Sequence, residues 1–317
     1  MSTALILILG LGFLWFGANL ITKAALRMAR SLAMSEGFIG MTVLALGTSF
    51  PEITIAVTGA LQKLTGQQTS GIVVGNAIGA SMNQLILIVA LSGLIRTIKF
   101  KKNNIFFDAT FVIVVISAFY AASLDGSISR IEGMVFVLFY VFYLLFLSRR
   151  NFMEQIASHI KRKFSKRRVR FMDVLQLVLG LIILAQSSQV VLAKAVLLAS
   201  QLGVSESTIG IVLLGFGASL PELVVAINAA VKGATALSLG NLIGGTVVNV
   251  CLAMGLGAAI AGWDIDRSLV QFDIPYLLFS AVIVILFIAS RNKLDRKESL
   301  LLFSLYLVYL FLKAMGL

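Results

Sequence analysis

Two stretches of the chain place a proline and a glutamate inside otherwise apolar sequence. Residues 37–57 contain the motif G-T-S-F-P-E, and residues 207–227 contain the motif G-A-S-L-P-E. An offset of 170 residues aligns Pro51-Glu52 with Pro221-Glu222. Proline inside a helix costs about 3 kcal/mol, and a carboxylate at membrane depth costs about as much again. Both residues fit a broken membrane helix whose freed polar groups line a cavity.

The two glutamates indicate the chemistry of such a cavity. Of fourteen acidic residues, only Glu52 and Glu222 fall in the middle of an apolar run. Two carboxylates that converge repel each other, so both ionise only with a cation between them, and otherwise one or both hold a proton. The other expected ligands are side-chain oxygens on the same and the following apolar runs, namely those of Thr48, Ser49, Ser219, Gln84 and Asn249.

An oxygen-only site of this kind suits Ca²⁺ and can equally serve Na⁺. Two negative charges neutralise one Ca²⁺, two Na⁺ or two H⁺. If these ions exclude one another at a site that opens to alternate sides of a membrane, their transport is coupled as antiport. The sequence therefore predicts a cation antiporter.

A second repeated motif follows each Pro-Glu stretch. Residues 74–84 read V-G-N-A-I-G-A-S-M-N-Q, and residues 239–249 read L-G-N-L-I-G-G-T-V-V-N, at an offset of 165. Close helix packing alone could explain the glycines of this motif, without any role in the ion site. The amides Gln84 and Asn249 can bond across helices structurally, but their paired positions opposite the paired Pro-Glu helices favour a lining of the site.

The composition is that of an integral membrane protein. The 317 residues are 59% hydrophobic and only 13% charged, and the mean hydropathy is +1.00. Apolar runs long enough to span a bilayer fall at 4–27, 37–61, 70–95, 105–124, 131–148, 173–199, 207–231, 236–262, 270–290 and 299–316. Because each half contains an odd number of runs, the second copy must enter from the opposite side.

The predicted fold is therefore all-α, with ten transmembrane helices in two inverted five-helix repeats and with helices 2 and 7 broken. The first repeat is expected over residues 1–148, with its motif at 37–84, and the second over 172–317, with its motif at 207–249. Residues 149–171 form a basic linker that contains the chain's single histidine, His159.

The net charge of +12 is explained by membrane topology and requires no nucleic acid. Alternate connections hold 21 Lys and Arg residues, and the opposite side holds five. By the positive-inside rule the linker is cytoplasmic and both termini are extracellular, in a multi-pass protein of the cell membrane. The start of the chain lacks a basic region before its apolar run, so we expect a retained span. Asp108 and Asp273, at the entries to spans 4 and 9, are expected to be interfacial anchors.

The two Pro-Glu motifs, each followed by a glycine-asparagine motif, resemble the repeats of the sodium/calcium exchanger family, within the cation/Ca²⁺ antiporters. The resemblance covers most of the chain. It implies that helices 2, 3, 7 and 8 surround the ions and that the first two helices slide across the rest during alternation. It also implies that Glu52 and Glu222 bind Ca²⁺ with the hydroxyls of Thr48, Ser49 and Ser219. Ala45 and Gly215 match positions that offer main-chain carbonyls.

The chain departs from the family pattern at three side-chain oxygens. Ala218, Ala80 and Gly245 stand where the family usually has hydroxyls that help to form sodium sites, and Gln84 replaces a shorter amide. The calcium ligands are retained, so the sequence leaves open whether the coupling ion is Na⁺ or H⁺.

Three other classes of protein fit the sequence less well. An intramembrane hydrolase could use two buried carboxylates, but it would not require duplicated broken helices. A channel would conduct without exchange, and a purely structural protein would not explain the matched Pro-Glu pairs. We therefore expect a transporter that is not an enzyme, has no cofactor beyond its transported ions, and works as a monomer.

Overall fold

The structure is a computed structural model, and it describes residues 3–99, 102–159, 169–201, 215–217, 219–291 and 293–315. Each of the ten predicted apolar runs contains helix in its described part. Among the described residues, six helices are long and apolar enough to cross a membrane, or seven if one bent pair counts as a single span. The chain is thus an all-helical membrane protein.

In the first half, helices are interrupted by short π-helical segments, labelled η. The elements are α1 (Thr3–Ser31), α2 (Glu36–Ile39), η1 (Gly40–Leu44), α3 (Ala45–Thr48), α4 (Phe50–Leu64), α5 (Ser70–Met82), η2 (Asn83–Ile88), α6 (Val89–Ile95), β1 (Ile98–Lys99), α7 (Lys102–Ser123), β2 (Ser127–Ile128) and α8 (Arg130–His159). Helix α8 therefore continues into the basic linker, and residues 160–168 of that linker lie outside the described residues.

The second half follows the same order. Its elements are α9 (Phe171–Gln201), α11 (Gly215–Gly217), α12 (Leu220–Val231), α13 (Thr235–Val247), η4 (Val248–Ala253), α14 (Met254–Ala261), β3 (Trp263–Asp264), η5 (Leu269–Asp273), α15 (Ile274–Arg291), β4 (Lys293–Leu294) and α16 (Arg296–Ala314). Residues 202–214 and Ala218, which include much of the second Pro-Glu run, lie outside the described residues.

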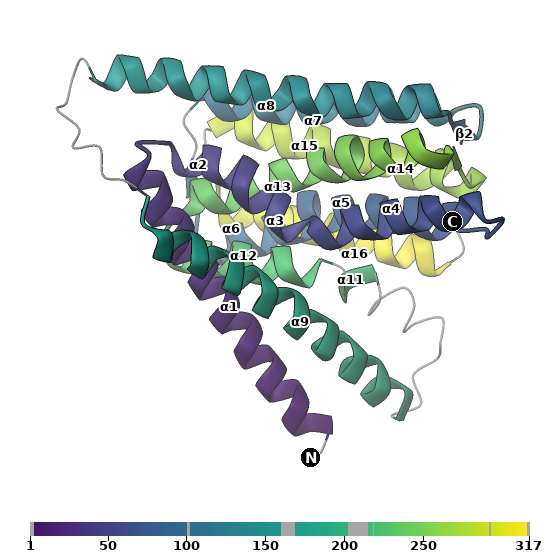
Figure 1. Ribbon diagram of the computed structural model, residues 1–317, viewed down its shortest axis with the longest axis horizontal. Coiled ribbons are helices and arrows are strands. Elements are labelled where there is room, and N and C mark those ends of the chain that lie inside the picture. Colours follow the sequence, from purple (N-terminus) through teal and green to yellow (C-terminus); the bar gives the residue numbers. More distant parts are fainter. Residues whose placement is uncertain are drawn as a thin grey trace.

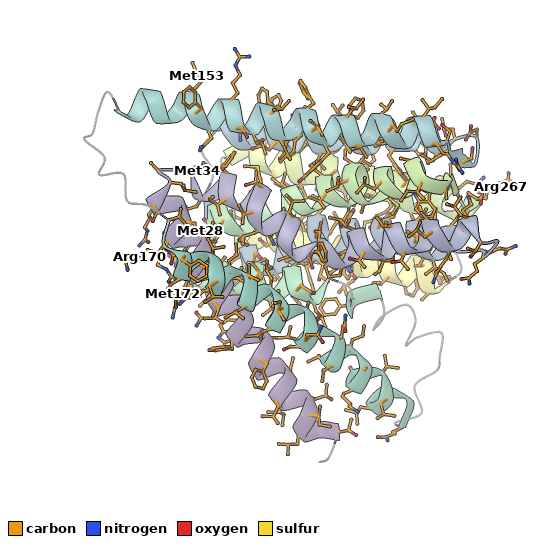
Figure 2. All side chains as sticks on the ribbon, in the orientation of Figure 1. Met28, Met34, Met153, Arg170, Met172 and Arg267 are labelled. Atoms are coloured by element: carbon orange, nitrogen blue, oxygen red, sulfur yellow. The ribbon has the colours of Figure 1, made fainter. Side chains whose placement is uncertain are left out.

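The long helices form two groups (Figure 1). Helices α1 and α9 pack along each other and run at a slant to the rest, which lie in a roughly parallel bundle. Arg170 and Met172 lie at one end of the molecule, and Arg267 lies at the opposite end (Figure 2).

The repeated glycines bring helices from the two halves into backbone contact. A Cβ atom at Gly240 would lie 2.5 Å from the carbonyl oxygen of Gly37, and one at Gly244 would lie 2.5 Å from that of Met41. No real side chain tolerates such distances, so α13 can cross α2 and η1 only with glycine at these places. The packing explanation of these glycines is thereby confirmed.

Two short antiparallel strand pairs, which the sequence analysis did not predict, tie loops of the two halves together. Strand β1 pairs with β4, with Ile98 opposite Leu294, and β2 pairs with β3, with Ile128 opposite Trp263. Each pair joins a connection of the first half to one of the second half.

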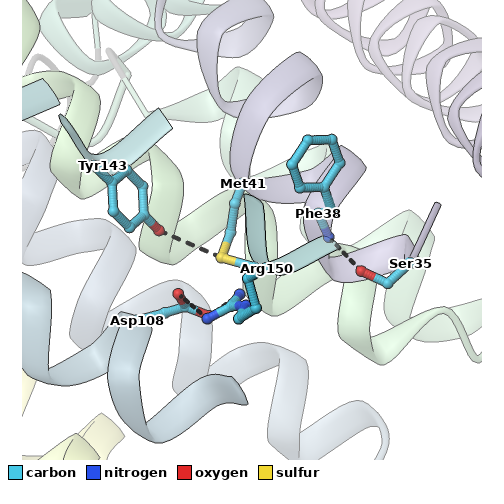
Figure 3. A network of polar contacts seen from close by, with 6 residues as sticks. All are labelled: Ser35, Phe38, Met41, Asp108, Tyr143 and Arg150. Carbon is cyan, nitrogen blue, oxygen red and sulfur yellow. Dashed lines mark hydrogen bonds and ion pairs between the residues drawn. The ribbon is translucent and has the colours of Figure 1, made fainter. Parts of the chain in front are cut away.

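Asp108 and Asp273 anchor helices, but they do so inside the protein rather than at an exposed interface. Asp108 on α7 is fully buried and forms a two-pronged ion pair with Arg150 on α8, with both N···O distances 2.9 Å. Figure 3 shows this pair beside Tyr143, whose hydroxyl contacts the sulfur of Met41 in η1. Asp273 is held by Lys313 at 2.6 Å and also accepts a hydrogen bond from Tyr309. Both residues therefore anchor helices as expected, and partner cations compensate their buried charges.

Candidate functional site

Each Pro-Glu motif lies where a helix stops and restarts. The segments 36–48 and 50–64 meet at an angle of 47°. Ser49 takes φ −86° and ψ 11° at the first break, and Ser219 takes φ −93° and ψ 9° at the second. Proline occupies the first turn of α4 and of α12, where its missing N–H removes no helical hydrogen bond. The predicted break at the first motif is confirmed, and a helix begins afresh at the second.

Both glutamates stand in the first turn of the helix that restarts after the break. Glu52 belongs to the first turn of α4 and Glu222 to the first turn of α12. The unpaired backbone N–H groups and the helix dipole make this end of a helix favourable for an anion. The side chains of Glu52 and Glu222 are 2% and 0% exposed. Each break therefore supports a carboxylate that has been removed from solvent.

The two carboxylates have different surroundings. Glu222 accepts a hydrogen bond from the hydroxyl of Ser49 through Oε1, at 3.3 Å, and its Oε2 has no partner among the described residues. Neither carboxylate oxygen of Glu52 has a partner there. The charges of the two residues act on each other. The pair is thus close, buried and incompletely hydrogen-bonded.

Thr48 and Gln84 reach toward helix α13. The Thr48 hydroxyl donates to the carbonyl oxygen of Leu44 at 3.0 Å and lies 3.3 Å from Oδ1 of Asn241. The Gln84 amide oxygen accepts a hydrogen bond from the hydroxyl of Thr246 at 3.3 Å. All four polar side chains are buried. Asn241 and Thr246 belong to the repeated glycine motif, but the sequence analysis did not count them in the site.

Gln84 occupies the space that Gly245 leaves free. A Cβ atom at Gly245 would lie 2.9 Å from Nε2 and 3.0 Å from Oε1 of Gln84. The Gln84 amide therefore packs against Gly245 and leaves no room for a side chain there unless it moves. An amide group fills the place where the family pattern has a serine.

Ser219 is held by a residue that sequence reasoning missed. Asn83 donates through Nδ2 to the Ser219 hydroxyl oxygen at 3.1 Å, and Tyr306 donates to Oδ1 of Asn83 at 2.6 Å. Asn83 precedes Gln84 in the motif, so an amide in an apolar run was the available signal. Nothing local in the sequence marks Tyr306.

Ala45 and Gly215 are the two positions predicted to contribute main-chain carbonyl oxygens. The carbonyl oxygen of Ala45 accepts the N–H of Ser49 at 3.1 Å, which leaves one lone pair for another partner. At the second break the N–H of Ser219 bonds Phe216 instead, at 3.1 Å, so it does not engage Gly215 in α11. Ala218, the departure expected to affect sodium binding, lies outside the described residues.

Unsatisfied polar atoms gather around the two glutamates. In the described part of the chain, nine buried side-chain nitrogen and oxygen atoms lack a hydrogen-bond partner. Seven of them belong to Glu52, Gln84, Glu222, Asn241 and Asn249, and Asn249 lacks a partner on both its oxygen and its nitrogen. Such groups are rare in folded proteins and each requires an explanation. A cation between the carboxylates would satisfy the oxygens.

The donor set is the one that hard cations prefer. Over the residues that the structure describes, no group of three or more His, Cys, Asp or Glu side chains could hold a metal. Any cation at the breaks would therefore be bound by two carboxylates together with neutral hydroxyl, amide and carbonyl oxygens. Oxygen-only coordination of this kind suits Ca²⁺ and Na⁺ and disfavours transition metals.

Comparison with known proteins agrees with this arrangement. The family profile described as sodium/calcium exchanger protein matches residues 2–149 and 172–315. The chain therefore belongs to the sodium/calcium exchanger protein family, and it is a multi-pass membrane protein of the cation/Ca²⁺ antiporter type.

Individual relatives match along nearly their whole length. The sodium/calcium exchanger MaX1 of Methanosarcina acetivorans is 27% identical over 349 residues, which cover 96% of this chain and 97% of that protein. The uncharacterized membrane protein MJ0091 of Methanocaldococcus jannaschii is 30% identical over 98% of this chain and 97% of its own. The sodium-calcium exchanger NCX_Mj, in crystals soaked with Na⁺ and Sr²⁺, superimposes with a TM-score of 0.82 at 26% identity, covering 96% of each chain.

Proposed function

We propose that this chain exchanges Ca²⁺ for Na⁺ by alternating access at a site between Glu52 and Glu222. The observation that carries the proposal is the pair of buried carboxylates at the helix breaks, because three of their four oxygens have no hydrogen-bond partner among the described residues. Two negative charges balance one Ca²⁺ or two monovalent cations. Competition for the same oxygens couples the movement of one ion to the return of the other.

The ligands that we assign to this site are the side chains of Glu52, Glu222, Thr48, Ser49, Ser219, Gln84 and Asn249, with main-chain carbonyls of Ala45 and Gly215. The hydrogen bond from Ser49 to Glu222 supports the convergence of the two breaks, and the bond from Asn83 to Ser219 places η2 beside the second break. The protein is a transporter and not an enzyme in this proposal, and the ions are cargo rather than cofactors.

Ca²⁺/H⁺ antiport is the second candidate. Glu52 has no hydrogen-bond donor on either oxygen among the described residues, and a buried carboxyl without donors favours its neutral form. Gln84 also fills the space over Gly245 with an amide, where a sodium ligand would otherwise stand. In this alternative the same two glutamates carry the protons.

We further propose ten spans in two inverted repeats, with both termini outside the cell membrane and with the linker in the cytoplasm. The recurring order of breaks, π-helical segments and buried Asp residues in the two halves supports the repeats. The location of Arg170 and Arg267 at opposite ends of the molecule fits the charge count. We expect the monomer to be the transporting unit, because both breaks come from one chain.

The test is ⁴⁵Ca²⁺ uptake into proteoliposomes that contain the purified protein. One set is loaded with Na⁺ at equal pH, and a second set has an acid interior and no Na⁺. Uptake driven by outward Na⁺ alone supports Na⁺/Ca²⁺ exchange, and uptake driven by the proton gradient alone supports the second candidate. Ca²⁺ flux that needs neither counter-ion would identify a channel and overturn both.

A further inference from the structure

A chain of three buried side chains links the second helix break to the last helix. The Tyr306 hydroxyl on α16 donates to Oδ1 of Asn83 on η2, and Nδ2 of Asn83 donates to the hydroxyl oxygen of Ser219. The donor–acceptor distances are 2.6 Å and 3.1 Å. The exposed fractions of the three side chains are 6%, 3% and 1%, so water competes little with these bonds.

Tyr306 and Ser219 contact opposite ends of the Asn83 amide. A carbonyl oxygen can only accept, and an amide nitrogen can only donate. Because Tyr306 donates to the oxygen, the NH₂ group is turned toward Ser219. The Ser219 oxygen then has one lone pair engaged, while its second lone pair and its proton remain for the site.

The matching positions of the other repeat, Val248, Ser49 and Tyr140, lack this arrangement. The offset of 165 that aligns the glycine motifs places Val248 opposite Asn83. Tyr140, which lies 166 residues before Tyr306, is buried on α8, and α8 packs against η4 as α16 packs against η2. The Tyr140 hydroxyl has no partner in the described part of the chain, as expected opposite a valine.

The two break serines consequently behave differently. Ser49, which has valine at the matching position, turns its hydroxyl to donate to Oε1 of Glu222. Ser219, which has Asn83, accepts from the amide instead. A serine that accepts from an amide keeps its oxygen fixed, whereas a serine without this partner is free to rotate toward a carboxylate.

We propose that Asn83, oriented by Tyr306, is a positioning residue that fixes the Ser219 oxygen for the divalent cation and so sets the affinity of the site. This inference rests on the proposed Ca²⁺ transport. Asn83 and Tyr306 act through Ser219 and are not themselves ligands. Their loss lowers Ca²⁺ affinity and leaves the rate of the transport cycle intact.

The experiment compares Tyr306→Phe with Tyr140→Phe, which removes the matching hydroxyl from the other half. A single hydrogen bond is typically equivalent to about a two- to tenfold change in binding, so Tyr306→Phe should raise the apparent KM for Ca²⁺ by about that factor. Its maximal uptake rate should stay within about twofold of wild type on the same reasoning. Tyr140→Phe should leave both quantities unchanged. Equal KM values for the two variants would overturn the inference.

Asn83→Val is the second variant, because valine stands at the matching position 248 in the natural chain. It should raise the KM at least as much as Tyr306→Phe does. Thermal unfolding with and without Ca²⁺ gives an affinity readout that does not depend on transport. The Ca²⁺-induced rise in Tm should shrink in both variants and persist in Tyr140→Phe.

The same series separates this inference from the proposed function. Suppose that Glu52→Gln abolishes uptake but that Tyr306→Phe and Asn83→Val keep the wild-type KM for Ca²⁺. This result would reject the positioning role alone. A wild-type protein that neither takes up Ca²⁺ nor gains stability from it would reject the proposed function and this inference with it.

Discussion

Glu52 and Glu222 occupy matching places in sequence but different places in the hydrogen-bond network. Ser49 donates to Glu222, and neither oxygen of Glu52 has a donor among the described residues. A buried charge with unsatisfied oxygens is strongly unfavourable, so both carboxylates depend on a bound cation or a proton. The two halves of the site are chemically unequal despite their shared motif.

Glu52→Gln and Glu222→Gln should each abolish Ca²⁺ uptake, because one negative charge cannot balance a divalent cation in a buried site. Both variants should still insert and elute as folded protein. Glu132→Gln is the matched control, since Glu132 binds Ser129 at the start of α8, away from the breaks. Proteoliposome uptake checks the prediction. Near-normal uptake by either site variant would contradict the assignment.

The contact between Gln84 and Gly245 makes a second prediction at this scale. Gly245→Ser places a Cβ atom about 3 Å from the Gln84 amide, and overpacking of this kind costs about 1–3 kcal/mol. Adding Gln84→Asn, which is one methylene shorter, should recover most of the lost stability. Thermal unfolding in detergent measures both effects. If the two changes were simply additive, the residues would not be a matched pair.

At the scale of elements, buried aspartates in the described part of the chain fasten pairs of helices, and one of them, Asp173 on α9, pairs with Arg27 on α1. Asp108 joins α7 to α8 through Arg150, and Asp273 joins η5 to α16 through Lys313 and Tyr309. These pairs surround the bundle and do not enter the site. These contacts hold α7 against α8 and η5 against α16. Rigid neighbouring helices help to keep the ligands of the site in a fixed geometry.

Arg150→Met should destabilise the protein by about 3–5 kcal/mol, because the buried Asp108 carboxylate loses its guanidinium. Asp108→Asn in the same chain should restore much of the loss. Lys63→Met is the control: its partner Asp264 has a side chain that is 78% exposed, and exposed pairs contribute about 0–1 kcal/mol. Thermal unfolding compares the three. A loss from Lys63→Met as large as that from Arg150→Met would contradict the argument.

At the scale of the whole molecule, α1 and α9 form a slanted pair beside the bundle (Figure 1). A cavity of about 250 Å³, lined almost entirely by apolar groups, lies between α9 and the two breaks. Its lining includes Thr48, Pro51 and Pro221 from the breaks and Leu181 from α9. If α1 and α9 slide across the site, as the proposed alternating access requires, a cavity here reduces the number of packed contacts that must break.

Cross-links test whether the pair moves as a unit. In a Cys251→Ala background, Gly10→Cys with Val191→Cys joins α1 to α9, where the two Cβ positions lie 3.9 Å apart, close to the usual disulfide spacing. Oxidation of this protein should leave uptake intact. Gly47→Cys with Leu181→Cys joins the break to α9, and oxidation should stop uptake until the bond is reduced. Unchanged uptake through the second cross-link would show that α9 does not slide past α3.

The sequence by itself determined the membrane class, the positions of the helices and the first break, because hydropathy, proline and buried charge act locally along the chain. It also singled out both glutamates, which the structure places buried at the starts of α4 and α12. Only the tertiary structure decided which of these groups meet. Three contacts join residues far apart in sequence: Gln84 with Gly245, Tyr306 with Asn83, and Arg150 with Asp108. Such contacts depend on how helices cross, and no local pattern records that geometry.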